Sequence, residues 1–226
     1  MRPIEELSGT MFRLSPYRRH ATLRPMTPEL LSSFVLFAFV TSITPGPNNI
    51  MVTASGLSFG FRRTVPHMIG IVVGFTVMVA AVGLGLGAAF AAWPLLYELL
   101  KYGGAAYLLY LAWKIARSGP ISAGDEAGRP MTFLEAAAFQ WVNPKAWVMA
   151  VGAIATYTPQ VGFLGNLAIV TVVFGLVNLP SVGCWALFGI ALRRVLHAPA
   201  AVRAFNLGMA LLLVGSLYPI AAELLG

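Results

Sequence analysis

Two short polar motifs interrupt apolar stretches of the chain and contain most of its candidate binding residues. The motifs consist of Thr44, Pro45, Gly46, Pro47, Asn48 and Asn49, and of Gln140, Asn143, Pro144 and Lys145. Proline lacks an N–H donor and clashes with the carbonyl four residues earlier, so both motifs predict breaks within helices. The prolines would free the carbonyls of Thr41, Ile43 and Gln140 from helical hydrogen bonds.

The groups exposed by such breaks suit a ligand that carries both charges. A helix that begins after a break presents unpaired N–H groups and the positive end of its dipole, which together favour a carboxylate. The freed carbonyls can accept hydrogen bonds from an ammonium group. We therefore predict that these residues bind an amino acid or a related amine-bearing metabolite. The alternative is that the prolines only kink the helices and ease their packing.

Three charged residues within apolar stretches are candidates for charge pairing or coupling. A lysine near the middle of a membrane span costs ~2.5–3.5 kcal/mol unless it is paired or hydrated. Lys145 would therefore bind a substrate carboxylate or alternate between partners, or else neutralise a structural acid. Glu98 and Lys101 lie three residues apart and can face each other on a helix. They predict an ion pair near the membrane interface, or a proton-carrying role for Glu98.

The composition places these residues in a membrane. Of the 226 residues, 58% are apolar and 10% are charged, whereas soluble domains average roughly 45–50% and about 25%. So few charges could not cover a soluble globule, which excludes a soluble enzyme, a secreted disulfide scaffold and a disordered chain. The basic residues form short clusters between apolar runs, as in membrane proteins, so we expect a lipid bilayer and no nucleic acid as partner.

The apolar stretches predict an all-α integral membrane protein. A bilayer core about 30 Å thick needs ~20 mainly apolar helical residues. Six stretches qualify, at approximately 29–53, 64–90, 93–116, 132–157, 161–192 and 201–225. Residues 1–25 form a basic N-terminal extension that lacks the apolar core of a signal peptide. We interpret Met26 as the natural start, with a genuine basic tail as the alternative.

The six spans divide into two halves with the same plan. The repeats cover about 28–117 and 132–226, and a loop at 118–131 joins them. Three spans per half make the second half enter the membrane from the opposite face, so the repeats are inverted, as in many secondary transporters. The first span of each half contains one of the two breaks. A third break, at Asn178-Leu179-Pro180 in the fifth span, is also expected, either as a further wall of the cavity or as a polar contact between helices.

The distribution of Lys and Arg predicts the orientation. The first, third and fifth loops carry basic residues, and the second and fourth carry none. The positive-inside rule then places the odd-numbered loops in the cytoplasm and both ends of the six-helix bundle outside. His67 falls near the cytoplasmic end of the second span, where an interfacial position is expected.

The motifs resemble those of the lysine-exporter (LysE) family, whose members export amino acids and related small metabolites. The resemblance covers Met26 to Gly226. It rests on Thr44 to Asn48, Gly56 to Arg62, Gly70 and Gly74, Leu100 to Leu108, and Asn143 to Ala146. It implies a six-helix exporter of the bacterial inner membrane that is driven by the proton gradient, with a homodimer among its possible assemblies.

Other classes of protein fit the sequence less well. A passive channel or permease remains the alternative, although no span carries the ring of charges that a selective ion pore tends to use. An enzyme would need a base beside a nucleophile or a metal cluster. The single cysteine, Cys184, and the scattered His20, His67 and His197 form no such group. We therefore expect no enzymatic activity, no cofactor and no metal.

Overall fold

The structure is a computed structural model that describes residues 26–86, 92–117, 129–195, 198–218 and 221–222. The proposed N-terminal extension 1–25, most of the loop 118–131 and residues 87–91 lie outside this part of the chain. The described residues form helices joined by short loops, with no strand among them. The all-α prediction is therefore confirmed for the described ranges.

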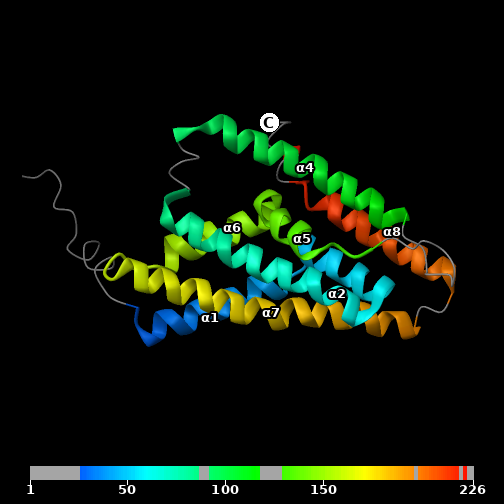
Figure 1. Cartoon of the computed structure of the whole chain (residues 1–226), viewed down its shortest axis with the longest axis horizontal. Coiled ribbons are helices and arrows are strands. Elements are labelled where there is room, and N and C mark those ends of the chain that lie inside the picture. The colour runs from blue at the N-terminus through cyan, green and yellow to red at the C-terminus, as the bar shows by residue number, and fades with distance from the viewer. Residues whose placement is uncertain (1–25, 87–91, 118–128, 196–197, 219–220, 223–226) are drawn as a thin grey trace, which may run out of the picture.

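The helices lie side by side along the long axis of the molecule (Figure 1). They are α1 (Pro28–Ile43), α2 (Pro47–Ala81), a π-helical turn η2 (Val82–Leu86), α4 (Pro94–Arg117), α5 (Phe133–Phe139), a 3-10 turn η3 (Gln140–Val142), α6 (Pro144–Tyr157), α7 (Phe163–Val195) and α8 (Pro199–Gly215).

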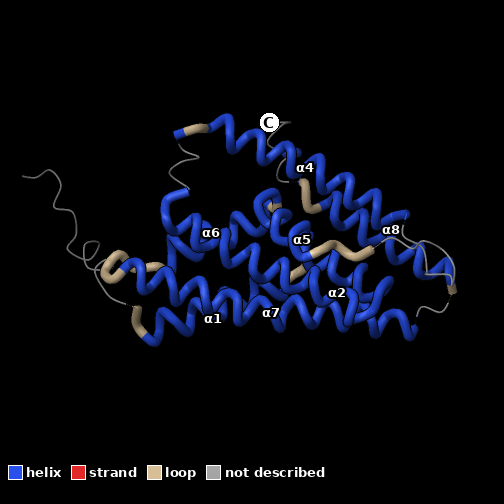
Figure 2. The backbone as a smooth tube through the Cα atoms, viewed as in Figure 1, coloured by secondary structure: helices blue, strands red, loops and turns tan. Residues whose placement is uncertain are grey.

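The structure has breaks at both motifs. Helix α1 ends at Ile43 and α2 begins at Pro47, with Thr44 and Gly46 in extended conformations. The second break follows η3, where Asn143 is extended and α6 begins at Pro144. Proline suits the first position of a helix because its missing N–H would have no intrahelical acceptor there. Both breaks lie in the middle of the molecule rather than at its ends (Figure 2).

The first predicted loop is a sharp bend within α2 rather than a turn from Gly56 to Arg63. The helix continues on both sides of Gly60, whose φ of 76° and ψ of 174° are not helical. Such a positive φ is accessible to glycine at little cost. The chain reverses direction at this bend (Figure 1). The first predicted span therefore corresponds to α1 with the first arm of α2, and the second span to the second arm.

The predicted break at Asn178-Leu179-Pro180 is wrong. Helix α7 runs through Pro180 without interruption over 33 residues. A proline removes one helical hydrogen bond, and neighbouring helices can support the helix around it. Helix α7 packs closely against α2 on both sides of this point, because a Cβ on Gly175 would meet Thr76 and one on Gly189 would meet the backbone of Thr53.

Length and hydropathy mark two described segments as able to cross a membrane, Pro47–Gly85 and Phe163–Leu192. Pro28–Ile43 and Ala200–Gly215 are equally apolar in character but shorter. The breaks explain part of this difference, since they divide the first and fourth predicted spans into shorter helices. Large apolar side chains such as Leu134, Val148 and Leu164 are exposed on the outside, which suits a surface that faces lipid.

An aromatic cluster joins α1, α2 and α7 beside the first break. Phe174 of α7 contacts Phe34 of α1 and Phe75 of α2 edge to face, with ring centroids 5.2 and 4.9 Å apart. All three side chains are buried, and edge-to-face packing is a favourable geometry for aromatic pairs. The cluster therefore packs the middle of α1 against the two long helices.

Candidate functional site

Lys145 in the first turn of α6 connects the second break to the first. Its Nζ donates hydrogen bonds to the Thr44 carbonyl at 2.6 Å, the Thr44 hydroxyl at 3.0 Å and the Pro45 carbonyl at 3.3 Å. Lys145 forms no ion pair with any described residue. Its ammonium is therefore held by neutral oxygens alone.

Asn48 and Gln140 form a second connection between the breaks. Asn48 Nδ2 donates to Gln140 Oε1 at 2.8 Å, and Gln140 Nε2 donates to Asn48 Oδ1 at 3.1 Å. Gln140 Nε2 also donates to the Ala136 carbonyl at 2.9 Å, and the Gln140 side chain is fully buried. One residue from each break thus contributes to each of the two connections.

The carbonyls at the end of α1 already have donors within the protein. Asn49 Nδ2 donates to the carbonyls of Ser42 and Thr44 at 2.8 Å each. The Trp185 indole donates to the Ile43 carbonyl at 3.0 Å, and the Thr44 hydroxyl donates to the Thr41 carbonyl at 3.1 Å. The carbonyls of Thr41 and Ile43 are therefore paired, contrary to the expectation that a ligand ammonium would find them free.

The N-termini of the two helices after the breaks differ. Helix α6 is capped by Asn143, whose side-chain oxygen accepts from the Lys145 N–H at 3.2 Å. Gly46 precedes α2 and provides no side-chain cap, and the Ile50 N–H donates to the Gly46 carbonyl. The first N–H groups of a helix have no intrahelical acceptor. The start of α2 is therefore the better place for an anion.

Gly46 makes room for the Lys145 side chain at the first break. A Cβ at this position would lie 2.5 Å from Cδ and 3.1 Å from Nζ of Lys145. The backbone of Gly46 is extended, so any residue could adopt its conformation. The requirement for glycine is therefore one of space.

A pocket lies between the two breaks, with an empty volume of about 330 Å³ including the open space at its mouth. It is lined by Thr41, Ser42, Gly46, Asn48, Asn49, Phe75, Asn143, Lys145, Ala146, Met149, Asn178 and Val182. Ser42 Oγ and Asn178 Oδ1 are buried and have no hydrogen-bond partner in the described chain. Since buried polar atoms are normally paired, these two oxygens are candidates for hydrogen bonds that the described chain does not supply.

Half of the ten predicted binding residues line this pocket. They are Gly46, Asn48, Asn49, Asn143 and Lys145, whereas Thr44, Pro45, Pro47, Gln140 and Pro144 form the breaks around it. No sequence pattern indicated Ser42, which resembles any small polar residue in a span. Asn178 was expected as part of a break that could add a wall to the cavity; the break does not exist, but Asn178 does line the pocket.

The predicted pair of Glu98 and Lys101 is present on α4 but does not line the pocket. Lys101 Nζ lies 3.0 Å from Glu98 Oε1. The Lys101 side chain is 7% exposed and that of Glu98 is 41% exposed. Lys101 also lies over the ring of Tyr102. A coupling role for Glu98 stays a prediction.

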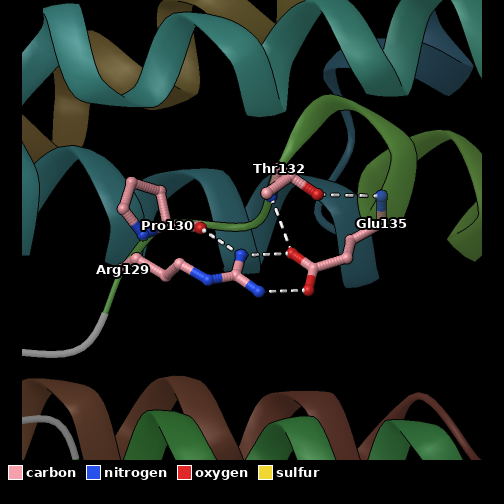
Figure 3. A network of polar contacts seen from close by, with 4 residues as sticks. All are labelled: Arg129, Pro130, Thr132 and Glu135. Carbon is pink, nitrogen blue, oxygen red and sulfur yellow. Dashed lines mark hydrogen bonds and ion pairs between the residues drawn. The ribbon is translucent and has the colours of Figure 1, made fainter.

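A polar network anchors the start of α5, which leads to the second break (Figure 3). Thr132 and Glu135 form a capping box, and the Arg129 guanidinium binds both Glu135 oxygens at 2.7 and 2.6 Å. The hydrogen bonds from Arg129 to this carboxylate raise the pKa of the guanidinium. The network holds the short helix that carries Gln140 towards Asn48.

His67 lies in the interior between the helices, and its depth in the membrane stays a prediction. Its side chain is fully buried, and Nδ1 lies 3.1 Å from the Ser55 hydroxyl. Ser55 and His67 come from opposite arms of α2, so the bend at Gly60 is what brings them together. Sequence position near the end of a span could not reveal this contact.

The chain resembles known membrane translocators over most of its length. The model of the LysE type translocator family matches residues 39–217. Proteins named cysteine/O-acetylserine efflux protein from Escherichia coli (strain K12), Escherichia coli O9:H4 (strain HS) and Shigella sonnei (strain Ss046) are each 37% identical over 191 residues. These matches cover 84% of this chain and 96% of each relative. No solved structure matches the chain.

The family match separates transport from enzymatic catalysis. Translocators move solutes and are not enzymes, so the prediction of a transporter without enzymatic activity is confirmed. The resemblance first noted from the two break motifs is confirmed as well, because the matched region contains both of them. The chain belongs to the LysE type translocator family.

Proposed function

We propose that this protein exports small amino acids or related amine-bearing metabolites across the bacterial inner membrane by secondary transport. The observation that carries the proposal is the pocket between the two breaks, lined by Asn48, Asn49, Asn143 and Lys145. Polar backbone in the middle of a membrane is tolerated where it lines a cavity. Discontinuous helices around a central site are typical of secondary transporters.

The polar groups of the pocket favour a small zwitterion. The uncapped start of α2 suits a carboxylate, while the oxygens at the first break suit an ammonium. Ser42 Oγ and Asn178 Oδ1 can accept hydrogen bonds from further donor groups of the substrate. Cysteine and O-acetylserine, which the names of the relatives specify, are small amino acids of this type and are our first candidates.

The proposed architecture is six spans in two inverted repeats. Each repeat would begin with a broken helix, α1 with the first arm of α2 in one and α5 with α6 in the other. The bend in α2 and the C-terminal ends of α4 and α7 gather at one end of the molecule (Figure 1). The basic loops of the sequence follow these points, so this end would face the cytoplasm and both ends of the bundle the periplasm.

Transport would proceed by rocking of one repeat against the other, which exposes the pocket to each side in turn. The hydrogen bonds of Lys145 with Thr44 and Pro45, and of Asn48 with Gln140, cross between the repeats and would have to rearrange. Coupling to protons and assembly as a homodimer are part of the proposal. Glu98 remains the candidate for the proton-carrying group.

Reconstituted protein tests this function. Proteoliposomes are loaded with a panel of amino acids that includes cysteine and O-acetylserine, and efflux is followed with and without a pH gradient. We expect efflux of at least one small amino acid, stimulated by the gradient, and counterflow of the labelled substrate. Efflux of no member above empty vesicles would exclude amino-acid export. Efflux without counterflow or a gradient effect would indicate a passive permease.

A further inference from the structure

The Lys145 ammonium occupies a cradle of three oxygens that belong to the other repeat. Two are the carbonyls of Thr44 and Pro45 and the third is the Thr44 hydroxyl, at 2.6, 3.3 and 3.0 Å from Nζ. A primary ammonium has three N–H donors and no acceptor, so the three oxygens of the cradle provide one acceptor for each donor. The carbonyls follow the last turn of α1, where the helix dipole favours a cation.

The cradle is built for a side chain that passes over the first break. Gly46 leaves the space through which the Lys145 stem runs, since a Cβ there would lie 2.5 Å from Cδ. Asn49 fixes the Thr44 carbonyl from the other side through a hydrogen bond of 2.8 Å. Gly46 and Lys145 both line the pocket, so the cradle borders the space in which a substrate would bind.

The ammonium in this cradle has no anionic partner among the described residues. A lysine that served as the fixed anchor of a substrate carboxylate would be expected to direct its ammonium into the pocket. Here all three hydrogen bonds of the ammonium go to uncharged oxygens that follow α1. The Lys145 ammonium is thus bound by the same kind of contacts that would bind a free primary ammonium group.

We propose that the cradle is a binding site for the primary ammonium group of the substrate, and that Lys145 occupies it when substrate is absent. This proposal rests on the proposed function. The substrate ammonium displaces Lys145 from Thr44 and Pro45, and the displaced Lys145 remains in the pocket that it lines, where the substrate carboxylate can receive it. The exchange keeps the cradle oxygens hydrogen-bonded in both states.

The proposal predicts that removing the Lys145 side chain raises, rather than lowers, the affinity for small primary amines. If Lys145 competes with the ligand for the cradle, Lys145→Ala opens the site and raises the affinity for small primary amines. If Lys145 instead anchors the carboxylate, the same change lowers the affinity for amino acids and creates no amine site. The two accounts therefore differ in direction.

Binding of methylammonium to the purified full-length protein measures this directly, by calorimetry at constant ionic strength. We expect at least tenfold tighter binding to Lys145→Ala and Lys145→Ser than to the wild type. Lys145→Met removes the charge but keeps a chain of similar length in the cradle, and it should give no gain. Tetramethylammonium has the charge but no N–H donor, so its affinity should not rise. Lys114→Ala removes an exposed lysine at the end of α4 and is the charge-matched control.

The outcomes separate the cradle from simple charge removal and from the proposed function. Equal gains for methylammonium and tetramethylammonium, or equal gains for Lys145→Met and Lys145→Ala, would overturn the cradle. No gain in whichever of the Ala and Ser variants is folded would overturn it as well. The binding measurement does not depend on transport. If the variants gain methylammonium binding but the wild type exports no amino acid, the proposed function is wrong and the cradle is still an ammonium site.

Discussion

Asn48 and Gln140 face each other across the two helix breaks and exchange two amide hydrogen bonds, of 2.8 and 3.1 Å. The residues are 92 positions apart and come from opposite repeats of the proposed architecture. An amide pair of this kind satisfies a donor and an acceptor on each side chain at once. The pair thus links the two breaks through two hydrogen bonds between the same two side chains.

Removing both members of this pair should destabilise the protein by less than the sum of the two single removals. Asn48→Ala leaves the buried Gln140 amide with an unpaired oxygen, and a buried unsatisfied group costs about 1–3 kcal/mol. The variant Asn48→Ala/Gln140→Ala should therefore lose less than the sum of the single losses. Thermal unfolding in detergent measures all four proteins. Additive losses would show that the two side chains do not interact.

Gly46→Ala should impair transport while the protein still folds. The added methyl would lie 2.5 Å from Lys145 Cδ and push the lysine from its cradle. We expect at least a tenfold loss of efflux, with normal amounts of protein in the membrane. Gly103→Ala on α4 is the matched control, because nothing lies within 4 Å of a Cβ there. An unchanged efflux rate for Gly46→Ala would argue against the close fit at the first break.

Gly60→Ala should destabilise the bend in α2 through the backbone alone. Its φ of 76° is unfavourable for residues with a Cβ, and such strain costs about 1–3 kcal/mol. No atom lies within 4 Å of the added methyl, so a clash is not the cause. Gly208→Ala, inside α8 and also in open space, provides the comparison. A lower midpoint of thermal unfolding is expected for Gly60→Ala only, and equal midpoints would contradict the bend.

Thr132→Ala should weaken the start of α5. It removes the hydroxyl that accepts from the Glu135 N–H at 3.2 Å, and loss of such a cap costs about 0.5–2 kcal/mol. Thr132→Ser keeps the hydroxyl and should restore most of the stability. A thermal unfolding midpoint for Thr132→Ala that equals that of Thr132→Ser would show that the capping box contributes nothing.

The two breaks could be predicted from the sequence because proline acts on its own helix. Contacts between helices could not be predicted from it. Pro45, Pro47 and Pro144 act on their own helices wherever these lie, so both breaks could be placed correctly. Pro180 carries the same signal, but the packing of α7 along α2 maintains the helix through it. A single sequence therefore cannot distinguish a proline that breaks a helix from one that its neighbours accommodate.

The candidate site was predictable only where it coincides with the breaks. The indole of Trp185 reaches the Ile43 carbonyl from 142 positions away, and no local pattern indicates this contact. Ser42 and Asn178 acquire their importance from the walls of a pocket that four helices build together. A loop between the first two spans could be predicted from the sequence, but not that helix continues up to Gly60 on both sides and that one residue makes the bend.

Substrate counterflow in the wild type and three variants tests most directly whether the pocket binds the transported molecule. Asn178→Leu and Ser42→Ala each remove a buried, unpartnered oxygen from the pocket. Thr171→Val removes another such oxygen, on α7 but outside the pocket lining. With labelled O-acetylserine or cysteine, we predict that counterflow falls at least tenfold in Asn178→Leu and Ser42→Ala and is unchanged in Thr171→Val. Equal counterflow in all four proteins would contradict a substrate site between the two breaks.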